Sequence, residues 1–196
     1  MTTPGWTIER LGASPTQRNA EIDELATLLV DTVAGGGSVG FMHPLPHDIA
    51  RNFWAAALEE SDRGHRVILG ATTPDRMDDG TQQRQTLIGT VSISVSAPQN
   101  QPHRAEIMKM MTARAFARQG AATTLLIAAE QIARDHEKTL LTLDTAEDGG
   151  AGRLYERLGY VRAGLIPGYA YKPHGGMTGT VLYWKRLDHT PAEQVA

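Results

Sequence analysis

The chain has 196 residues, of which 41% are hydrophobic and 21% charged, and its formal net charge is −3. This length and composition predict a single globular domain over residues 1–196, and the charge provides no broad attraction to nucleic acid or to an anionic membrane. The absence of cysteine excludes disulfides, thiolate metal sites and a cysteine nucleophile. The N-terminal sequence lacks the pattern of a secretory signal, and no apolar run approaches the roughly 20 residues of a membrane span, so we expect a cytoplasmic protein.

A strand, two helices and two more strands are predicted in the first half of the chain. Apolar alternation indicates the strands, and apolar residues at helical spacing indicate the helices. Thr16 is the expected N-cap of the first helix, which should end at the glycines 35–37 because glycine is unfavourable in a helix interior. A second helix is expected to begin within 46–48. The predicted strands are 5–11, 66–71 and 86–95, and a polar loop is expected at 72–85.

Residues 104–160 form the unit around which the rest of the chain is organised. The pattern predicts a strand at 104–112, a turn at 117–122, a helix, a strand at 139–145 and a short helix at 154–158. Such a crossover makes the two strands parallel and favours a ligand at their carboxyl ends, above the helix N-terminus. The turn holds only Gly120, so by itself it is equally consistent with a helix start in which glycine relieves crowding. Further strands are expected at 161–171 and 180–187, and the tail from 188 is expected to fray.

Motifs across nearly the whole chain resemble those of the GNAT superfamily of acyl-CoA-dependent N-acyltransferases. The family's turn signature is Gln or Arg, two residues, Gly, one residue, then Gly or Ala; Gly120 and Ala122 match it, whereas Ala117 departs from it. A second mark is the run LYERLGY at 154–160. The chain is most similar to the tabtoxin-resistance type, through SVGFMHPLP (38–46), RAEIMKMM (104–111), TLLTLDT (139–145) and LIPGYA (165–170). The resemblance implies an α/β fold with a mixed sheet, mostly antiparallel with one parallel junction, and helices on both faces.

The resemblance also implies the co-substrate, acetyl-CoA, and where it binds. The pantetheine arm would pair, like an added strand, with the backbone of Met110, Met111 and Thr112. The amides that would hold the pyrophosphate are those of Arg118, Gln119, Gly120, Ala121, Ala122 and Thr123. Asp148 stands for the polar residue, commonly Asn, that precedes the family's last helix.

Two acidic residues and one tyrosine are the catalytic candidates. Glu106 and Asp144 each lie in an otherwise apolar strand, where a buried charge is costly unless it is paired. By themselves they also fit an ion pair with Arg104 or Lys109, or a plain exposed position. The resemblance implies that both acids are catalytic. Glu106 is the first choice to accept the proton of the amine, while Asp144 would bind the ammonium or its water, and the two roles are exchangeable. It also implies that Tyr155 protonates the leaving thiolate, although a packed aromatic fits this place equally well.

The acceptor is expected to be the primary amine of a small molecule, such as an antibiotic or a toxin-like amine, entering beside residues 38–46. Phe41, His43 and Trp54 are the candidate substrate-binding residues. The alternative is packing between helix and sheet for the two aromatic ones, and a loop histidine without function for His43. No metal is expected, since His43 and His47 lack the third ligand that a metal site needs. The sequence leaves a homodimer open.

Two other functions also stay open. The first is a catalytically silent acyl-CoA sensor on the same fold. Measuring the turnover of acetyl-CoA across a panel of amines would distinguish such a sensor from an enzyme. The second is an unrelated nucleotide-binding α/β protein. Against it, the sequence has no GxxxxGKS/T loop and no GxGxxG run after an early strand.

Overall fold

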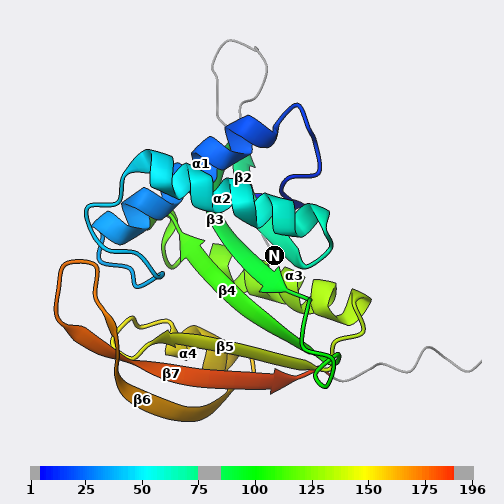
Figure 1. Cartoon of the computed structure of the whole chain (residues 1–196), viewed down its shortest axis with the longest axis vertical. Helices are drawn as coiled ribbons and strands as arrows, with labels where there is room; N and C mark the ends of the chain where they lie inside the picture. Colours follow the sequence, from blue (N-terminus) through cyan, green and yellow to red (C-terminus); the bar gives the residue numbers. More distant parts are fainter. Residues whose placement is uncertain (1–4, 75–84, 188–196) are drawn as a thin grey trace, which may run out of the picture.

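A computed structural model describes residues 5–74 and 85–187 of the chain. The polar loop expected at 72–85 falls mainly outside these ranges, and the tail expected to fray from 188 falls wholly outside them. The described strands are β1 (Thr7–Arg10), β2 (Arg66–Pro74), β3 (Gln85–Ser94), β4 (Arg104–Thr112), β5 (Leu140–Ala146), β6 (Val161–Tyr171) and β7 (Met177–Arg186) (Figure 1). The described helices are α1 (Arg18–Ala34), α2 (His47–Asp62), α3 (Ala121–Asp135) and α4 (Gly152–Arg157), with a 3-10 turn η1 (Arg114–Phe116). None of the helices in these ranges is long and apolar enough to cross a membrane.

One seven-stranded sheet, in the order β1-β2-β3-β4-β5-β7-β6, organises the described residues. Neighbouring strands are antiparallel at every junction except β4–β5, where residues 104–106 lie opposite residues 140–142 in parallel register. The crossover through α3 explains the exception, because a strand that returns by way of a helix runs in the direction of the first strand. The predicted mixed sheet with one parallel junction is confirmed.

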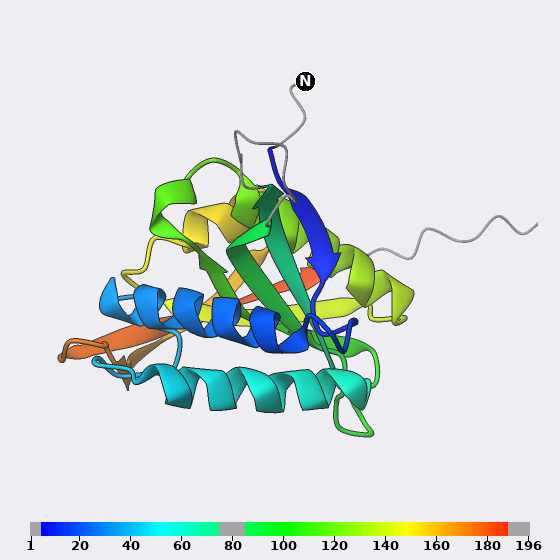
Figure 2. The same cartoon turned by 90° about the horizontal axis from the view of Figure 1, so that it is seen from above.

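Helices α1 and α2 cover one face of the sheet (Figure 2). A buried cluster joins Leu25 and Leu29 of α1 to Trp54 and Leu58 of α2 and to Ile68 of β2. The apolar residues of each helix recur at helical spacing, so that one face of each helix can pack inward. Full burial of a leucine or isoleucine side chain stabilises a fold by about 1.5–3 kcal/mol, and this layer therefore contributes strongly to stability.

Helix α3 and the short α4 cover the opposite face, as Figure 2 shows. Leu125, Ala129 and Ala133 of α3 recur at intervals of four residues and are fully buried against the sheet. Tyr155 of α4 packs against Tyr183 of β7, with the ring centres 5.7 Å apart. The prediction of helices on both faces is confirmed.

The layer made by α1 and α2 covers only part of its face. Val181 and Tyr183 of β7 are buried in the cluster beneath α3 and α4. The alternating Leu182 and Trp184 therefore point to the face of α1 and α2, where they are 39% and 36% exposed. The helices thus cover β1–β4 and leave the half of the sheet formed by β5, β7 and β6 open on this side.

Several predicted boundaries differ from the structure: β2, for example, continues to Pro74, into residues expected to form a loop. Two further differences have a local cause. Helix α1 begins at Arg18 and has no side-chain cap, because the Thr16 hydroxyl pairs instead with that of Ser14 at 3.0 Å. Strand β7 begins at Met177, earlier than the predicted 180. Pairing of Met177 with Tyr171 of β6 extends the hairpin into the glycine-containing stretch, which the local sequence marks as a loop.

A buried ion pair joins α3 to β7. The Glu130 carboxylate, which is 5% exposed, accepts a hydrogen bond of 2.6 Å from Lys185 Nζ. The same ammonium donates to the Leu158 carbonyl at 2.7 Å and lies 5.4 Å from the centre of the Tyr160 ring. Removing one partner of a buried pair leaves the other charge away from water without a counterion, which costs more than the intact pair contributes.

We expect Glu130→Leu to lower the free energy of unfolding by about 3 kcal/mol, because Lys185 loses its carboxylate. The double variant Glu130→Leu/Lys185→Met should recover most of this loss, since neither charge then remains. Chemical denaturation followed by circular dichroism measures both values. The control is Asp62→Ala, which removes the exposed partner of Arg18 and should leave stability nearly unchanged. A double variant no more stable than Glu130→Leu would contradict the role given to the pair.

Candidate active site

The parallel pairing between β4 and β5 is short, and the two strands then separate. It covers only residues 104–106 and 140–142, whereas β5 remains paired with β7 along its whole length. Strand β4 bends beyond this point: Lys109 has a left-handed φ of 51°, and the β3–β4 register shifts between Thr90 and Ser92. An irregularity of this kind bends a strand and increases its twist. Figure 1 shows the two ribbons diverging toward their carboxyl ends.

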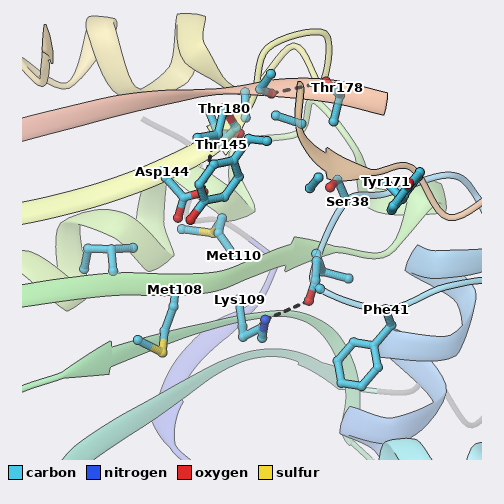
Figure 3. A pocket seen from close by; sticks show the side chains of 18 of the residues that line it. Ser38, Phe41, Met108, Lys109, Met110, Asp144, Thr145, Tyr171, Thr178 and Thr180 are labelled. Carbon is cyan, nitrogen blue, oxygen red and sulfur yellow. Dashed lines mark hydrogen bonds between the residues drawn. The ribbon is translucent and has the colours of Figure 1, made fainter. Parts of the chain in front are cut away.

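A cavity of about 540 Å³ lies where the strands diverge. Its walls come from residues 38–42 between α1 and α2, residues 107–110 of β4, the end of β5 with α4, and the β6–β7 hairpin. Figure 3 shows side chains from β4, β5 and β7 around it. The volume suits a small ligand, whose pockets typically measure about 300–1,000 Å³. The separation of two neighbouring strands thus creates the site.

Asp144 and Tyr155, two of the predicted catalytic residues, lie together in this cavity. Asp144 Oδ2 accepts a hydrogen bond of 2.8 Å from the Thr180 hydroxyl, which fixes the carboxylate on the cavity wall (Figure 3). Tyr155 is 4% exposed, and burial, followed by the negative charge of Asp144, raises its pKa to about 12. The phenol is therefore protonated at neutral pH and is available as a proton donor beside a carboxylate.

Glu106, the third predicted catalytic residue, lies outside the cavity wall. It shares a face of the sheet with Asp144, because Glu106 lies opposite Thr142 and Asp144 follows two residues later. The usual strand spacings place the Cα atoms of the two acids roughly 8 Å apart. Glu106 Oε2 lies 3.8 Å from Arg104 Nη1, and the Glu106 side chain is 44% exposed, so the ion pair considered from the sequence is also present.

Lys109 lines the cavity as well, a role that sequence reasoning missed. Its ammonium donates a hydrogen bond of 2.7 Å to the Val39 carbonyl (Figure 3) and lies 5.8 and 5.5 Å from the ring centres of Phe41 and Phe53. Burial is the main cause that lowers the pKa of Lys109. The ion pair with Glu106 considered from the sequence is not formed among the described residues. The only signal in the sequence was a lysine within the apolar run MKMM. The direction of the Lys109 side chain depends on the bend of β4, which the sequence does not show.

The turn after β4 presents backbone donors that have no protein partner. Arg118 and Gly120 have left-handed φ values of 62° and 104°, and α3 begins directly after Gly120 without a side-chain cap. Within the described residues, no backbone N–H from 118 to 123 donates to a protein acceptor. Such N–H groups at the positive end of a helix dipole are suited to an anion, phosphate in particular. The residues predicted to hold a pyrophosphate therefore have the free donors that this role requires.

One edge of β4 is also free between the cavity and the turn. Met111 and Thr112 pair with Thr90 and Gly89 of β3 on one side, while β5 has diverged on the other. An extended edge without a neighbouring strand can pair with an extended ligand. The predicted pantetheine contacts at residues 110–112 lie on this edge.

Asp148 fixes the connection between β5 and α4. One carboxylate oxygen accepts a hydrogen bond from Lys172, and the other accepts one of 3.0 Å from Thr178 Oγ1. The hydrogen bond from Lys172, followed by that from Thr178, lowers the pKa of Asp148. Both partners belong to the β6–β7 region, so the residue predicted to contact the cofactor anchors one wall of the cavity.

The three predicted substrate-binding residues have different positions. Phe41 lines the cavity. His43 lies beside the hairpin tip instead: its N–H donates to the Pro173 carbonyl at 2.9 Å, and its ring centre is 4.5 Å from that of His174. Trp54 is fully buried between α1, α2 and the sheet and does not reach the cavity, which corrects its assignment to substrate binding in favour of packing.

Comparisons with known proteins agree with this geometry. Residues 43–160 match the model of the acetyltransferase (GNAT) family. An N-acetyltransferase from Staphylococcus aureus aligns over 93% of this chain and 99% of its own, with 16% identity and a TM-score of 0.71. A ribosomal-protein-alanine N-acetyltransferase from Brucella melitensis aligns over 92% and 99%, with 17% identity and a TM-score of 0.70. The yncA protein from Salmonella typhimurium, solved with its cofactor acetyl-CoA, aligns over 98% and 99%, with 15% identity and a TM-score of 0.70.

The raised pKa of Tyr155 predicts a late step in the tyrosinate titration of the folded protein. Tyr155→Phe should remove one tyrosinate equivalent near pH 12, because burial opposes ionisation of this phenol. The stability that this shift contributes is fully present below pH 10 and is lost as pH rises through about 12. Tyrosinate absorbance measures the step, and circular dichroism at each pH confirms that the protein is folded. If Tyr155→Phe instead removes a tyrosinate that forms near pH 10, the Tyr155 phenol does not have the buried environment described here.

Proposed function

The chain belongs to the acetyltransferase (GNAT) family, and from that premise we propose that it transfers the acetyl group of acetyl-CoA to the primary amine of a small molecule. The observation that carries the proposal is the placement of Asp144 and Tyr155 in one cavity between the diverging strands. A carboxylate can accept the proton of the amine, and a protonated phenol can give a proton to the leaving thiolate, in a direct acetyl transfer. Within the family we propose the tabtoxin-resistance type, whose likeness in residues 38–46 and 104–111 suggests an antibiotic or toxin-like amine.

The co-substrate side is proposed to run from the turn to the cavity. Backbone N–H groups of residues 118–123 would hold the pyrophosphate, and the free edge at residues 110–112 would pair with the pantetheine arm. Ala117 cannot supply the side-chain contact that Gln or Arg gives elsewhere in the family, but the backbone donors do not depend on it. Acetyl-CoA supplies an acetyl group activated as a thioester, so its carbonyl carbon is the electrophile.

Removal of a proton from the acceptor is the first task of the chain. An alkyl amine with a pKa near ~10.4 is mostly protonated at pH 7, and forming the neutral amine there costs about 4.6 kcal/mol. We assign the proton to Asp144, directly or through one water, instead of to Glu106, the base first expected from the sequence, because Asp144 lies on the cavity wall and Glu106 lies outside it. Glu106, on the same face of the sheet, would attract the incoming ammonium.

The remaining steps concern the negative charge that develops. As the amine nitrogen bonds to the carbonyl carbon, the carbonyl oxygen becomes an oxyanion, which a backbone N–H at Met110 would stabilise. The carbon–sulfur bond then breaks, and the Tyr155 phenol would give its proton to the departing thiolate. Its pKa of about 12 keeps the proton on the phenol until the thiolate forms. The products are an N-acetylated amine and the CoA thiol.

A direct assay separates this enzyme from a silent acyl-CoA sensor on the same fold. Thiol release from acetyl-CoA should accelerate when a primary amine from a suitable panel is added. Amine-dependent formation of the acetylated product, detected by mass spectrometry, should account for the thiol. Tight acetyl-CoA binding without turnover of any amine would favour the sensor.

The turn predicts a selective effect of Gly120→Val on CoA binding. A valine side chain strains the left-handed backbone at φ 104° and should displace the N–H groups of the turn. We expect CoA affinity to fall by roughly tenfold or more, measured by calorimetry. The matched control is Gly64→Val, which imposes similar strain at φ 76° with no atom within 4 Å, in the connection between α2 and β2. Equal loss of CoA affinity in both variants would contradict the placement of the pyrophosphate.

The two acids predict different kinetic losses. Asp144→Asn should lower kcat by roughly 10²–10⁴ while acetyl-CoA affinity stays nearly intact, because the amide keeps the hydrogen bond from Thr180 but cannot accept a proton. Glu106→Gln should cost less and act mainly on KM for the amine. The measurement is kcat and KM against pH for the wild type and both variants. Wild-type turnover and pH profile in both variants would make the acids structural.

A further inference from the structure

We propose that Lys109 selects the acceptor of this reaction by binding an oxyanion, such as a carboxylate, that the amine substrate carries. The inference rests on the proposed function and narrows its substrate class to amines that bear an anionic group. Small α-amino acids and short peptides are the simplest members of that class. Lys109 is neither one of the predicted catalytic residues nor part of the turn proposed to hold the co-substrate.

The first support is the position of the ammonium. Lys109 belongs to the part of β4 that forms a cavity wall, and its nitrogen has one protein acceptor, the Val39 carbonyl at 2.7 Å. Phe41 and Phe53 stand 5.8 and 5.5 Å from the nitrogen, measured to their ring centres. An ammonium has three N–H donors and can therefore serve a ligand while it keeps the bond to Val39.

The second support is the missing counterion. Among the described residues, no carboxylate lies within ion-pair distance of Lys109, although burial removes much of its hydration. A buried charge is costly unless it is paired, and the aromatic rings offset only part of this cost. An oxyanion bound from the cavity would supply the missing partner. The positive charge of Arg66 also disfavours the ammonium. The negative charge of Asp144 favours it, but Asp144 forms no ion pair with Lys109 among the described residues.

The third support is the opposite charge across the cavity. Asp144 and Lys109 come from β5 and β4, the two strands that diverge to form the site, and Figure 3 shows both on its walls. An amine that carries an oxyanion could place its nitrogen at Asp144 and its anionic group at Lys109. Met108 and Met110 also line the cavity and offer apolar surface that adapts to ligands of varied shape. This arrangement fixes the direction in which the substrate lies.

A purely structural role for Lys109 is the competing explanation. The ammonium ties residues 38–42 to β4 through Val39, and it lies 3.2 Å from the place where a side chain on Gly40 would begin. Loss of that tie would loosen one wall of the cavity for every acceptor. The two roles therefore differ in one measurable way: only anion binding depends on the charge of the acceptor.

The test compares pairs of acceptors that differ only in that charge. A panel of α-amino acids and dipeptides is measured beside the matching C-terminal amides, on wild type and on Lys109→Met. We expect kcat/KM of the wild type to favour the acids, and the variant to lose roughly 10- to 100-fold on the acids and little on the amides. Lys138→Met, which removes a lysine that donates to the Pro102 carbonyl, is the control for net charge and should keep the wild-type preference.

Calorimetric binding of the same pairs to the CoA-bound protein gives a readout that needs no turnover. Preference for the acids that is lost in Lys109→Met supports the inference even in a protein that transfers no acetyl group, in which case only the proposed function fails. Turnover of amides and acids alike, or an equal loss on both in Lys109→Met, overturns the inference and leaves the proposed function standing. Failure of every acid in the panel to bind also overturns it.

Discussion

The short parallel pairing between β4 and β5 is the constraint on which the site depends. Hydrogen bonding joins residues 104–106 to 140–142 and then stops, because β4 bends at Lys109 while β5 remains paired with β7. Continued pairing would satisfy the edge of β4 and leave no room for the cavity. The same divergence therefore provides a free strand edge and a cavity of about 540 Å³.

Backbone groups, more than side chains, form the proposed co-substrate site. The turn after β4 holds Arg118 and Gly120 in left-handed conformations, and the first N–H groups of α3 have no protein acceptor in the described structure. Because these donors belong to the main chain, they tolerate a change such as Ala117 at a position where the family usually has a polar side chain. A site made of main-chain donors requires a particular backbone conformation, but it requires few particular side chains.

Burial affects two polar side chains of the cavity, Tyr155 and Lys109, in different ways. Tyr155 keeps its proton because desolvation and the nearby Asp144 oppose a phenolate. Lys109 is held by Val39 and by two aromatic rings without a carboxylate in contact among the described residues. One wall of the cavity thus carries a negative group and another a positive group, so charge as well as volume would restrict the acceptor. A further wall is fixed by Asp148, whose hydrogen bonds join the connection between β5 and α4 to the β6–β7 hairpin.

The sequence by itself determined the order of helices and strands, the single parallel junction and the family, because periodicity, the crossover and the motifs around Gly120 and 154–160 are local properties. It also indicated Asp144 and Tyr155, which the structure brings into one cavity. Only the tertiary structure decided that Trp54 is packed away from the cavity, since helical spacing is the same for a core residue and a pocket residue. It likewise decided the direction of Lys109, because the bend that turns its ammonium into the cavity arises from pairing with a distant strand.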